Sequence, residues 1–118
     1  MGAAAVINIP ELIDRLDNDF ELFVELVELF VDDSSNLLAK IGTAISSRDH
    51  ESLRKAAHTL KGAVANFSAP AAFEAASKLE QTGKNMELTG AEEQFLILKS
   101  EIESVLAEMK KLSEKGSF

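Results

Sequence analysis

Apolar residues recur at helical spacing along most of the chain, and no stretch alternates between apolar and polar residues as a half-buried strand does. The longest apolar stripe belongs to one helix face within residues 20–45. It consists of Phe20, Phe23, Val27, Phe30, Leu37, Ile41 and Ile45. A second series, in steps of three and four over residues 95–112, has the spacing of a helix-bundle seam. These two patterns predict an all-α protein.

Turn and capping residues divide the first half of this pattern into two predicted helices. Pro10 suits the first turn of a short helix over residues 11–16. Asn18 or Asp19 then caps a long helix, because short polar side chains at this position accept hydrogen bonds from the first backbone N–H groups. The segment "SSRD" closes this long helix.

Three more helices are expected in the rest of the chain. Asp49 caps a third helix over residues 50–67, and Pro70 begins a fourth, which is expected to fray near "TGKNMELTG". The fourth helix is expected to turn inward Phe73, Ala76 and Leu79. Thr89 and Glu92 have the spacing of a capping box at the start of a fifth helix. One short and four long helices predict an antiparallel four-helix bundle with a short additional N-terminal helix.

The bulk composition bounds the size and the partners of this fold. With 118 residues, 46% of them hydrophobic, we expect one domain over residues 1–118, ordered from about 9 to 112 with flexible termini. The net charge of −8 lies entirely in residues 1–39, which hold nine acids and one base. This charge argues against binding to nucleic acid, and no apolar run is long enough to insert into a membrane. The absence of cysteine fits a cytoplasmic protein, which we expect to be a monomer.

The third predicted helix contains a histidine and a glycine in unusual places. On a helical wheel Leu60 centres the apolar face, and His58 lies about 160° away from it. Gly62 follows one turn later on the outer side, although glycine within a helix costs about 1 kcal/mol relative to alanine. We therefore expect His58 to face water and Gly62 to leave room for a close approach. A β-carbon at position 62 is expected to crowd the imidazole.

Basic residues surround this histidine in the predicted helix. Arg54 and Lys55 lie one turn before His58, and Lys61 lies about one turn after it, which forms a basic island on an acidic chain. An exposed imidazole is largely uncharged and nucleophilic near pH 7, and histidine is a known covalent nucleophile. A nearby lysine can balance the charge of a phosphoryl group. On these residues alone, an ordinary surface histidine beside ordinary lysines stays the main alternative.

The segment "AAHTLKGAVANFSA", residues 56–69, resembles the signature of histidine-phosphotransfer (HPt) domains, which read His-x-Leu-Lys-Gly followed by small residues. The residues that match position for position are His58, Leu60, Lys61 and Gly62. "KLEQTGK" at residues 78–84 is similar to the family's Leu-Glu-x-x-Gly/Ala-basic segment, and "RDHESLRKAA" is similar to its usual lead-in. The resemblance covers roughly residues 9–112.

Two positions depart from the family pattern. The serine or small pair after Gly62 is Ala63 and Val64 in this chain, and the usual glycine near the helix end is Ser68. These positions lie on or beyond the core-facing part of the helix. They bear on how the third helix ends, and little on the acceptor.

The resemblance implies a phosphocarrier. His58 would accept a phosphoryl group from the aspartate of one receiver domain and pass it to another. The expected phosphate- or partner-binding residues are Lys61, Gly62, Lys55, Arg54 and Ala65. The implied partners are response-regulator receiver domains and a hybrid sensor kinase. No cofactor is expected in this chain, because the Mg²⁺ needed for transfer would belong to the receiver, and no kinase activity is expected.

Other interpretations stay open. The phosphoacceptor domain of a chemotaxis-type kinase has the same kind of bundle and a similar histidine motif, and a non-phosphorylated bundle adaptor is the alternative from another class. A sensor-kinase dimerisation domain fits less well, because no proline follows the histidine before Pro70. A metal site on one helix is disfavoured, because His50 and His58 lie about 12 Å apart along it.

Overall fold

The computed structural model describes residues 5–118, which contain five helices and no strand. The helices are α1 (Ile9–Arg15), α2 (Phe20–Ser46), α3 (His50–Ala65), α4 (Pro70–Lys84) and α5 (Ala91–Lys115). The predicted all-α fold is confirmed, and α5 extends past residue 112. Within the described residues no helix is both long and apolar enough to cross a membrane. Residues 1–4, part of the N-terminal region expected to be flexible, lie outside the described residues.

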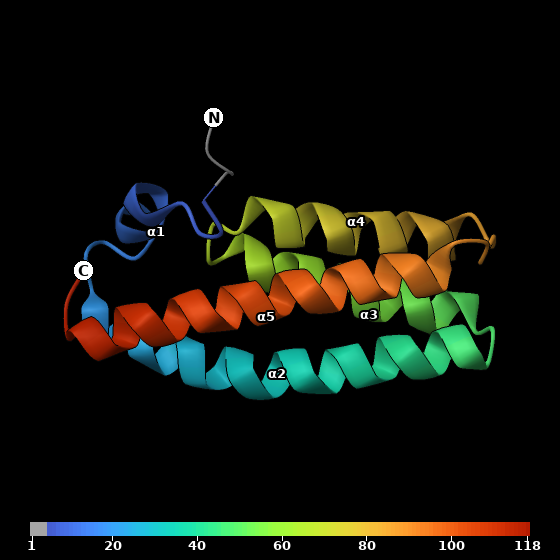
Figure 1. Ribbon diagram of the computed structural model, residues 1–118, viewed down its shortest axis with the longest axis horizontal. Helices are drawn as coiled ribbons and strands as arrows, with labels where there is room; N and C mark the ends of the chain where they lie inside the picture. The colour runs from blue at the N-terminus through green and yellow to red at the C-terminus, as the bar shows by residue number, and fades with distance from the viewer. Residues whose placement is uncertain (1–4) are drawn as a thin grey trace.

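The four longer helices lie side by side along the long axis of the molecule (Figure 1). α2 packs against α3 and α5, and α4 packs against the same two helices, so each long helix has two neighbours. The chain reverses its direction from each long helix to the next (Figure 1). The contact between α3 and α4 is the most extensive of these. The short α1 lies at the end of the molecule that also holds the C-terminus (Figure 1).

Two of the three predicted side-chain caps are present. Asp19 and Asp49 each accept a hydrogen bond from the backbone N–H three residues later, at 3.0 and 3.1 Å. The capping box predicted for α5 is wrong, because the residue before this helix is Gly90 with a φ of 82° and no side-chain cap. The Thr89 hydroxyl instead donates to Glu87 at 2.7 Å. The positive φ explains why a glycine stands there.

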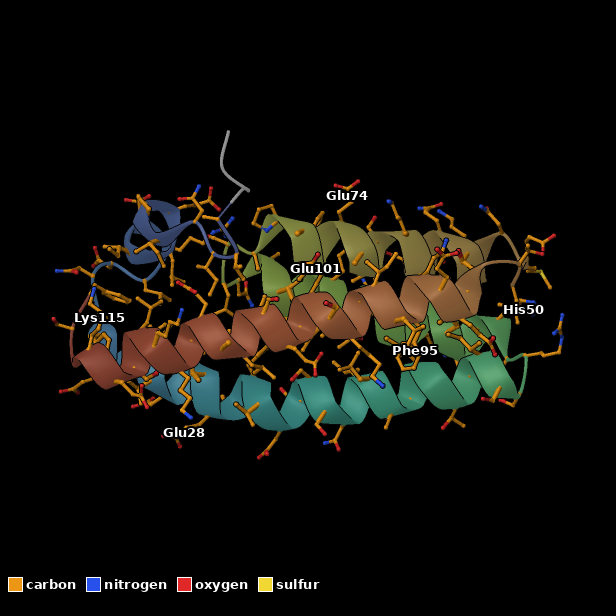
Figure 2. The ribbon with its side chains drawn as sticks, in the orientation of Figure 1. Glu28, His50, Glu74, Phe95, Glu101 and Lys115 are labelled. Atoms are coloured by element: carbon orange, nitrogen blue, oxygen red, sulfur yellow. The ribbon has the colours of Figure 1, made fainter. Side chains whose placement is uncertain are left out.

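Aliphatic side chains fill the core along the bundle, and phenylalanines fill one end. Five of the seven phenylalanines pack there with ring centroids 5.2 to 6.4 Å apart: Phe20, Phe23, Phe30, Phe67 and Phe118. Phe95 on α5 (Figure 2) packs over Gly42, where a β-carbon would lie 3.2 Å from its ring. The predicted inward position of Phe73 is wrong, because this residue is 40% exposed. Ala76 and Leu79 are buried as predicted, and the smaller Ala72 is buried in place of Phe73.

The turn between α3 and α4 is built around a strained serine. α3 ends at Ala65, two residues earlier than predicted, and Ser68 has a φ of 54°. This left-handed conformation costs a residue with a β-carbon roughly 1–2 kcal/mol, whereas glycine adopts it freely. Hydrogen bonds from α1 hold the serine. The Asn8 N–H donates to the Ser68 carbonyl at 2.8 Å, and Arg15 Nε donates to Ser68 Oγ at 3.0 Å.

α3 and α4 approach each other closely at Gly83. A β-carbon on this glycine would lie 2.8 Å from the Arg54 nitrogen and 2.9 Å from the His50 carbonyl oxygen. Both are backbone atoms of α3, so neither can rotate away. The prediction that α4 ends near "TGKNMELTG" is confirmed, because the helix stops at Lys84, the third residue of that segment.

We expect Gly83→Ala to destabilise the protein by about 1–3 kcal/mol, because the backbone of α3 must move to admit the new β-carbon. Gly62→Ala is the matched control, since a β-carbon at that helical glycine meets nothing within 4 Å. The control substitution should stabilise the fold by up to about 1 kcal/mol. Urea unfolding followed by circular dichroism measures both free energies. Equal effects of the two substitutions would contradict the close contact at Gly83.

Candidate functional site

His58, the expected acceptor, lies on the outer face of α3. Its side chain is 62% exposed, whereas Ala57 and Leu60 on the same helix are fully buried. The orientation predicted from the helical wheel is therefore confirmed. The core packing of α3 holds the backbone while the imidazole stays open to a partner.

A carboxylate from the neighbouring helix contacts this imidazole. Glu80 on α4 places Oε2 2.8 Å from Nδ1 of His58, and only 13% of the Glu80 side chain is exposed. Local sequence patterns do not single out Glu80, because the contact joins residues 22 positions apart on two helices. The signal that could have found it is its place in "KLEQTGK", directly after the buried Leu79 and one turn before Gly83.

The contact with Glu80 determines which imidazole nitrogen is free. An ionised carboxylate only accepts hydrogen bonds, so Nδ1 of His58 must be the donor. In the neutral imidazole the proton then resides on Nδ1, and Nε2 carries the lone pair. The exposed histidine therefore presents Nε2 as its nucleophilic atom.

Lys61 contacts the second oxygen of the same carboxylate. Its Nζ lies 2.6 Å from Glu80 Oε1, a buried oxygen on which no hydrogen-bond donor is well aligned, so the contact is an ion pair. The same Nζ lies 5.8 Å from the centroid of the Phe73 ring, within the range of a cation–π interaction. The Lys61 side chain is therefore only 24% exposed. One carboxylate holds both the imidazole and the ammonium group.

Glu80 is ionised at neutral pH. Its pKa is lowered first by the contact with Lys61, raised in part by burial, and lowered again by the hydrogen bond with His58. A carboxyl group whose pKa falls on folding stabilises the folded state fully at a pH above its ordinary pKa of 4.5. This stabilisation is lost as the pH falls through the pKa of the folded state. At neutral pH the ionised Glu80 carboxylate therefore forms a bridge between His58 and Lys61.

Arg54 and Lys55 contribute less to the basic island than the sequence indicates. The Arg54 guanidinium donates two hydrogen bonds to Glu51, at 3.0 and 2.7 Å. Lys55 Nζ lies 4.0 Å from the same carboxylate. Both cations are therefore paired with Glu51 within α3, whereas Lys61 shares the carboxylate of Glu80 with the imidazole.

The structure changes the expected roles of the two small residues. A β-carbon on Gly62 would meet nothing within 4 Å, so the prediction that it would crowd the imidazole is wrong. Gly62 is exposed, and the space it leaves opens to the outside of the protein. Ala65, expected to be exposed, is half-buried at the end of α3.

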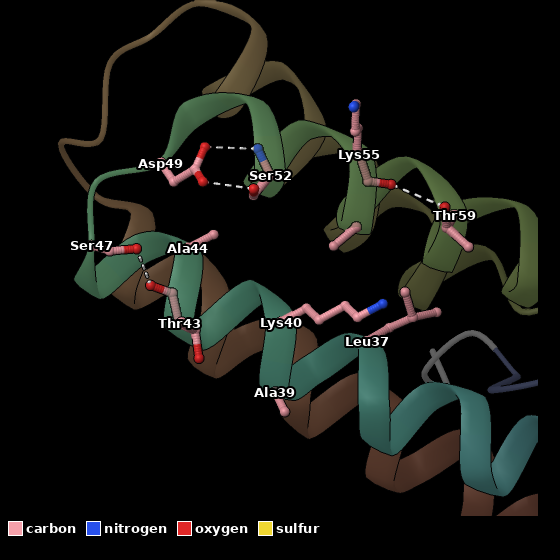
Figure 3. A pocket seen from close by; sticks show the side chains of 11 residues that line it. Leu37, Ala39, Lys40, Thr43, Ala44, Ser47, Asp49, Ser52, Lys55 and Thr59 are labelled. Carbon is pink, nitrogen blue, oxygen red and sulfur yellow. Dashed lines mark hydrogen bonds between the residues drawn. The ribbon is translucent and has the colours of Figure 1, made fainter.

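A groove of about 660 Å³ runs between α2 and α3 beside the site (Figure 3). The side chain of Lys40 extends across it from α2, whereas the amino group of Lys55 points away from α2 (Figure 3). Two hydroxyl groups of this groove bond to backbone carbonyls four residues earlier. Thr59 donates to the Lys55 carbonyl at 3.0 Å, and Ser47 donates to the Thr43 carbonyl at 2.7 Å. Both donors are therefore already used.

The second histidine is remote from this site. His50 begins α3 at the end of the molecule opposite Lys115 (Figure 2). Among residues 5–118, no three side chains of the types His, Cys, Asp or Glu gather as a metal site would require. The site therefore consists of an exposed imidazole that shares one carboxylate with an ammonium group.

Comparisons with known proteins show the family and the fold of this chain. The Hpt domain family model matches residues 25–108, which is more than half of the chain. The structure is similar to the crystal structure of histidine-containing phosphotransfer protein B (HptB) from Pseudomonas aeruginosa PAO1, with a TM-score of 0.89 and 23% sequence identity. The match covers 96% of this chain and 98% of that one, and at this identity it supports the shared fold alone. No curated protein matches the sequence. The chain belongs to the Hpt domain family, whose members carry phosphoryl groups on histidine in phosphorelays.

Proposed function

We propose that this protein accepts a phosphoryl group on Nε2 of His58 from the aspartate of one receiver domain and passes it to the aspartate of another. The observation that carries the proposal is the bridge formed by Glu80, which leaves Nε2 free and holds Lys61 within the same site. An exposed imidazole with a defined tautomer is suited to attack, and family membership supplies the class of reaction.

The first transfer is an in-line displacement at phosphorus. The lone pair of Nε2 attacks the phosphorus of the receiver's aspartyl phosphate, the N–P bond forms, and the P–O bond to the aspartate breaks. The aspartate leaves as a carboxylate, and Nδ1 keeps its proton. Positive charge develops on the imidazole during the attack, and the Glu80 carboxylate at Nδ1 stabilises it. The second transfer is the reverse of these steps with another receiver.

Lys61 balances the charge of the transferred group. In the free protein its ammonium group is paired with Glu80 Oε1. A phosphoryl group on Nε2 brings two further negative charges into reach of this flexible side chain. We infer that Lys61 then turns from Glu80 toward the phosphoryl oxygens, while Gly62 leaves room for the partner. Transition states of phosphoryl transfer are stabilised chiefly by such positioning and charge.

The remaining features of the proposal follow from a carrier role. The scaffold is an antiparallel four-helix bundle with a short additional helix, and it acts as one monomeric domain in the cytoplasm. The chain works without a nucleotide site or kinase activity of its own. Its partners are response-regulator receiver domains and a hybrid sensor kinase, and the receiver supplies the Mg²⁺. Arg54 and Lys55, although paired with Glu51, lie close enough to contact the partner.

We expect His58→Gln to abolish labelling by a receiver domain that has been phosphorylated with acetyl phosphate. The substitution removes the nucleophile from an exposed position, so the helix content should not change. His50→Gln, on the same helix, should be labelled as the wild type is. The measurement is transfer of radioactive phosphate, scored as acid-labile and base-stable. Retained labelling of the His58 variant would disprove the assignment.

Substitution of Glu80 tests the bridge. In Glu80→Gln the amide oxygen still accepts a hydrogen bond from Nδ1 but carries no charge, so phosphorylation should slow by about tenfold. In Glu80→Ala the acceptor is lost as well, and the rate should fall further. Nitrogen NMR of the imidazole should show the proton mainly on Nδ1 in the wild type and in Glu80→Gln. A wild-type-like tautomer in Glu80→Ala would contradict the positioning role.

We expect Lys61→Met to slow phosphoryl transfer about tenfold and to alter the lifetime of the phosphorylated form, because the methionine keeps the packing of the stem without the charge. Lys110→Met, on the exposed face of α5, is the control for a general change in net charge. Transfer rates and the decay of labelled protein measure both effects. If the two variants behave alike, Lys61 has no specific role toward the phosphoryl group.

A further inference from the structure

A small pocket of about 260 Å³ lies between α1 and the turn that joins α3 to α4. Its apolar wall is formed by Ala65, Ala69, Pro70 and Phe73. Phe73 leaves 40% of its surface exposed here, although it is one of only seven aromatic residues in the chain. The volume falls below the roughly 300–1,000 Å³ of clefts that hold small molecules, and it suits a single side chain.

Strain and hydrogen bonding maintain this pocket. Ser68 keeps the left-handed φ of 54° described above, and residues held in such conformations persist only where the surroundings enforce them. The bonds from Asn8 and Arg15 to Ser68 tie α1 to the turn, so α1 forms the second wall of the pocket. The hollow is therefore part of a fixed structure in which three segments of the chain meet.

The polar groups at the rim are already paired with one another. Arg15 Nε lies 3.3 Å from Glu11 Oε1 and 3.0 Å from Ser68 Oγ. The pKa of Glu11 is lowered first by a hydrogen bond with Ser68 and then by one with Arg15. An apolar side chain would cover the wall of Ala65, Ala69, Pro70 and Phe73 without disturbing these contacts. The lining of the pocket therefore favours an apolar side chain.

The pocket lies close to His58 on the same side of the bundle. Ala65 follows His58 by seven residues, which is two helical turns or about 10 Å along the same face of α3. The Phe73 ring continues from the pocket to the ammonium group of Lys61. A stable protein interface covers about 800 Å² on each partner, which corresponds to a radius of about 16 Å. A receiver domain centred on His58 therefore covers the pocket.

We propose that this pocket receives one exposed aliphatic or aromatic side chain of the receiver domain and so helps to set which receiver docks and in which orientation. The inference rests on the proposed function, because it takes the partner to be a receiver that reaches His58. It adds a recognition element outside the His-x-Leu-Lys-Gly segment. The pocket contributes affinity and orientation, and it takes no part in the chemical step.

Filling the pocket tests the proposal. Ala65→Leu adds a side chain into the hollow at similar helix propensity, and Ala71→Leu makes the same change in the groove between α4 and α5. The probe is the phosphorylated receiver domain that labels His58 fastest in the wild type. We expect Ala65→Leu to raise the half-saturating receiver concentration roughly tenfold, as loss of one buried anchor does. Ala71→Leu should keep the wild-type value.

Two further measurements separate docking from chemistry and from folding. Phosphoramidate is a small phosphoryl donor that needs no docked protein, so its labelling rate reports the reactivity of the imidazole. Each receiver-dependent labelling rate is divided by this phosphoramidate rate. The leucine of Ala65→Leu could displace α1, and a lower melting temperature would show this. Phe73→Ala then serves as the second variant, because it removes one wall of the pocket without a clash. It should also raise the half-saturating receiver concentration. Phe73→Leu should restore it in part.

The outcomes are distinct. Equal half-saturation for Ala65→Leu and Ala71→Leu, with both folded, would overturn the pocket proposal while leaving the proposed function intact. Failure of every receiver to label the wild-type protein would overturn both. A loss of labelling by phosphoramidate in Ala65→Leu that matches its loss with the receiver would also count against docking.

Discussion

The close packing of α3 against α4 is the constraint on which the functional site depends. A β-carbon on Gly83 would lie 2.8 Å from the backbone of α3, so the two helices meet at a distance that only glycine permits. One turn earlier on α4, Glu80 reaches His58 at 2.8 Å and Lys61 at 2.6 Å. A wider separation of the helices would break both contacts. The small residues of this interface therefore place a carboxylate where the chemistry requires one.

The same carboxylate gives two side chains of α3 different tasks. At His58 it holds the proton on Nδ1, which leaves Nε2 free, and under the proposed mechanism it supports positive charge on the ring during attack. At Lys61 it holds a cation beside the imidazole without placing it on the nucleophilic nitrogen. The cost of burying the charges is offset because they are paired. Under the proposed mechanism, the arriving phosphoryl group competes with Glu80 for Lys61, so the site changes its internal pairing when it is loaded.

The sequence predicts the features that depend on local spacing, and it misses those that depend on contact between helices. The outward orientation of His58 follows from 3.6-residue periodicity, and the cap at Asp49 follows from its short side chain. The role of Glu80 depends on the separation and rotation of α4 relative to α3, which no local pattern encodes. The exposure of Phe73 also depends on contact between helices. An aromatic side chain at helical spacing is normally expected to be buried, but α4 buries small residues against its neighbours and leaves the Phe73 ring outside.

Chemistry and partner choice rest on different parts of this fold. The match to the family model begins at residue 25, so the bridge around His58 lies within it, whereas α1 lies outside it. α1 shapes the pocket beside Ala65 by its bonds to Ser68, where a serine accepts backbone strain in a turn that glycine would make without cost. In return, the serine supplies a side-chain Oγ that accepts a hydrogen bond from Arg15, and glycine has no such atom. α1 contributes none of the reacting groups. Substitutions in α1 can therefore change which receiver domain binds without altering the transfer chemistry at His58.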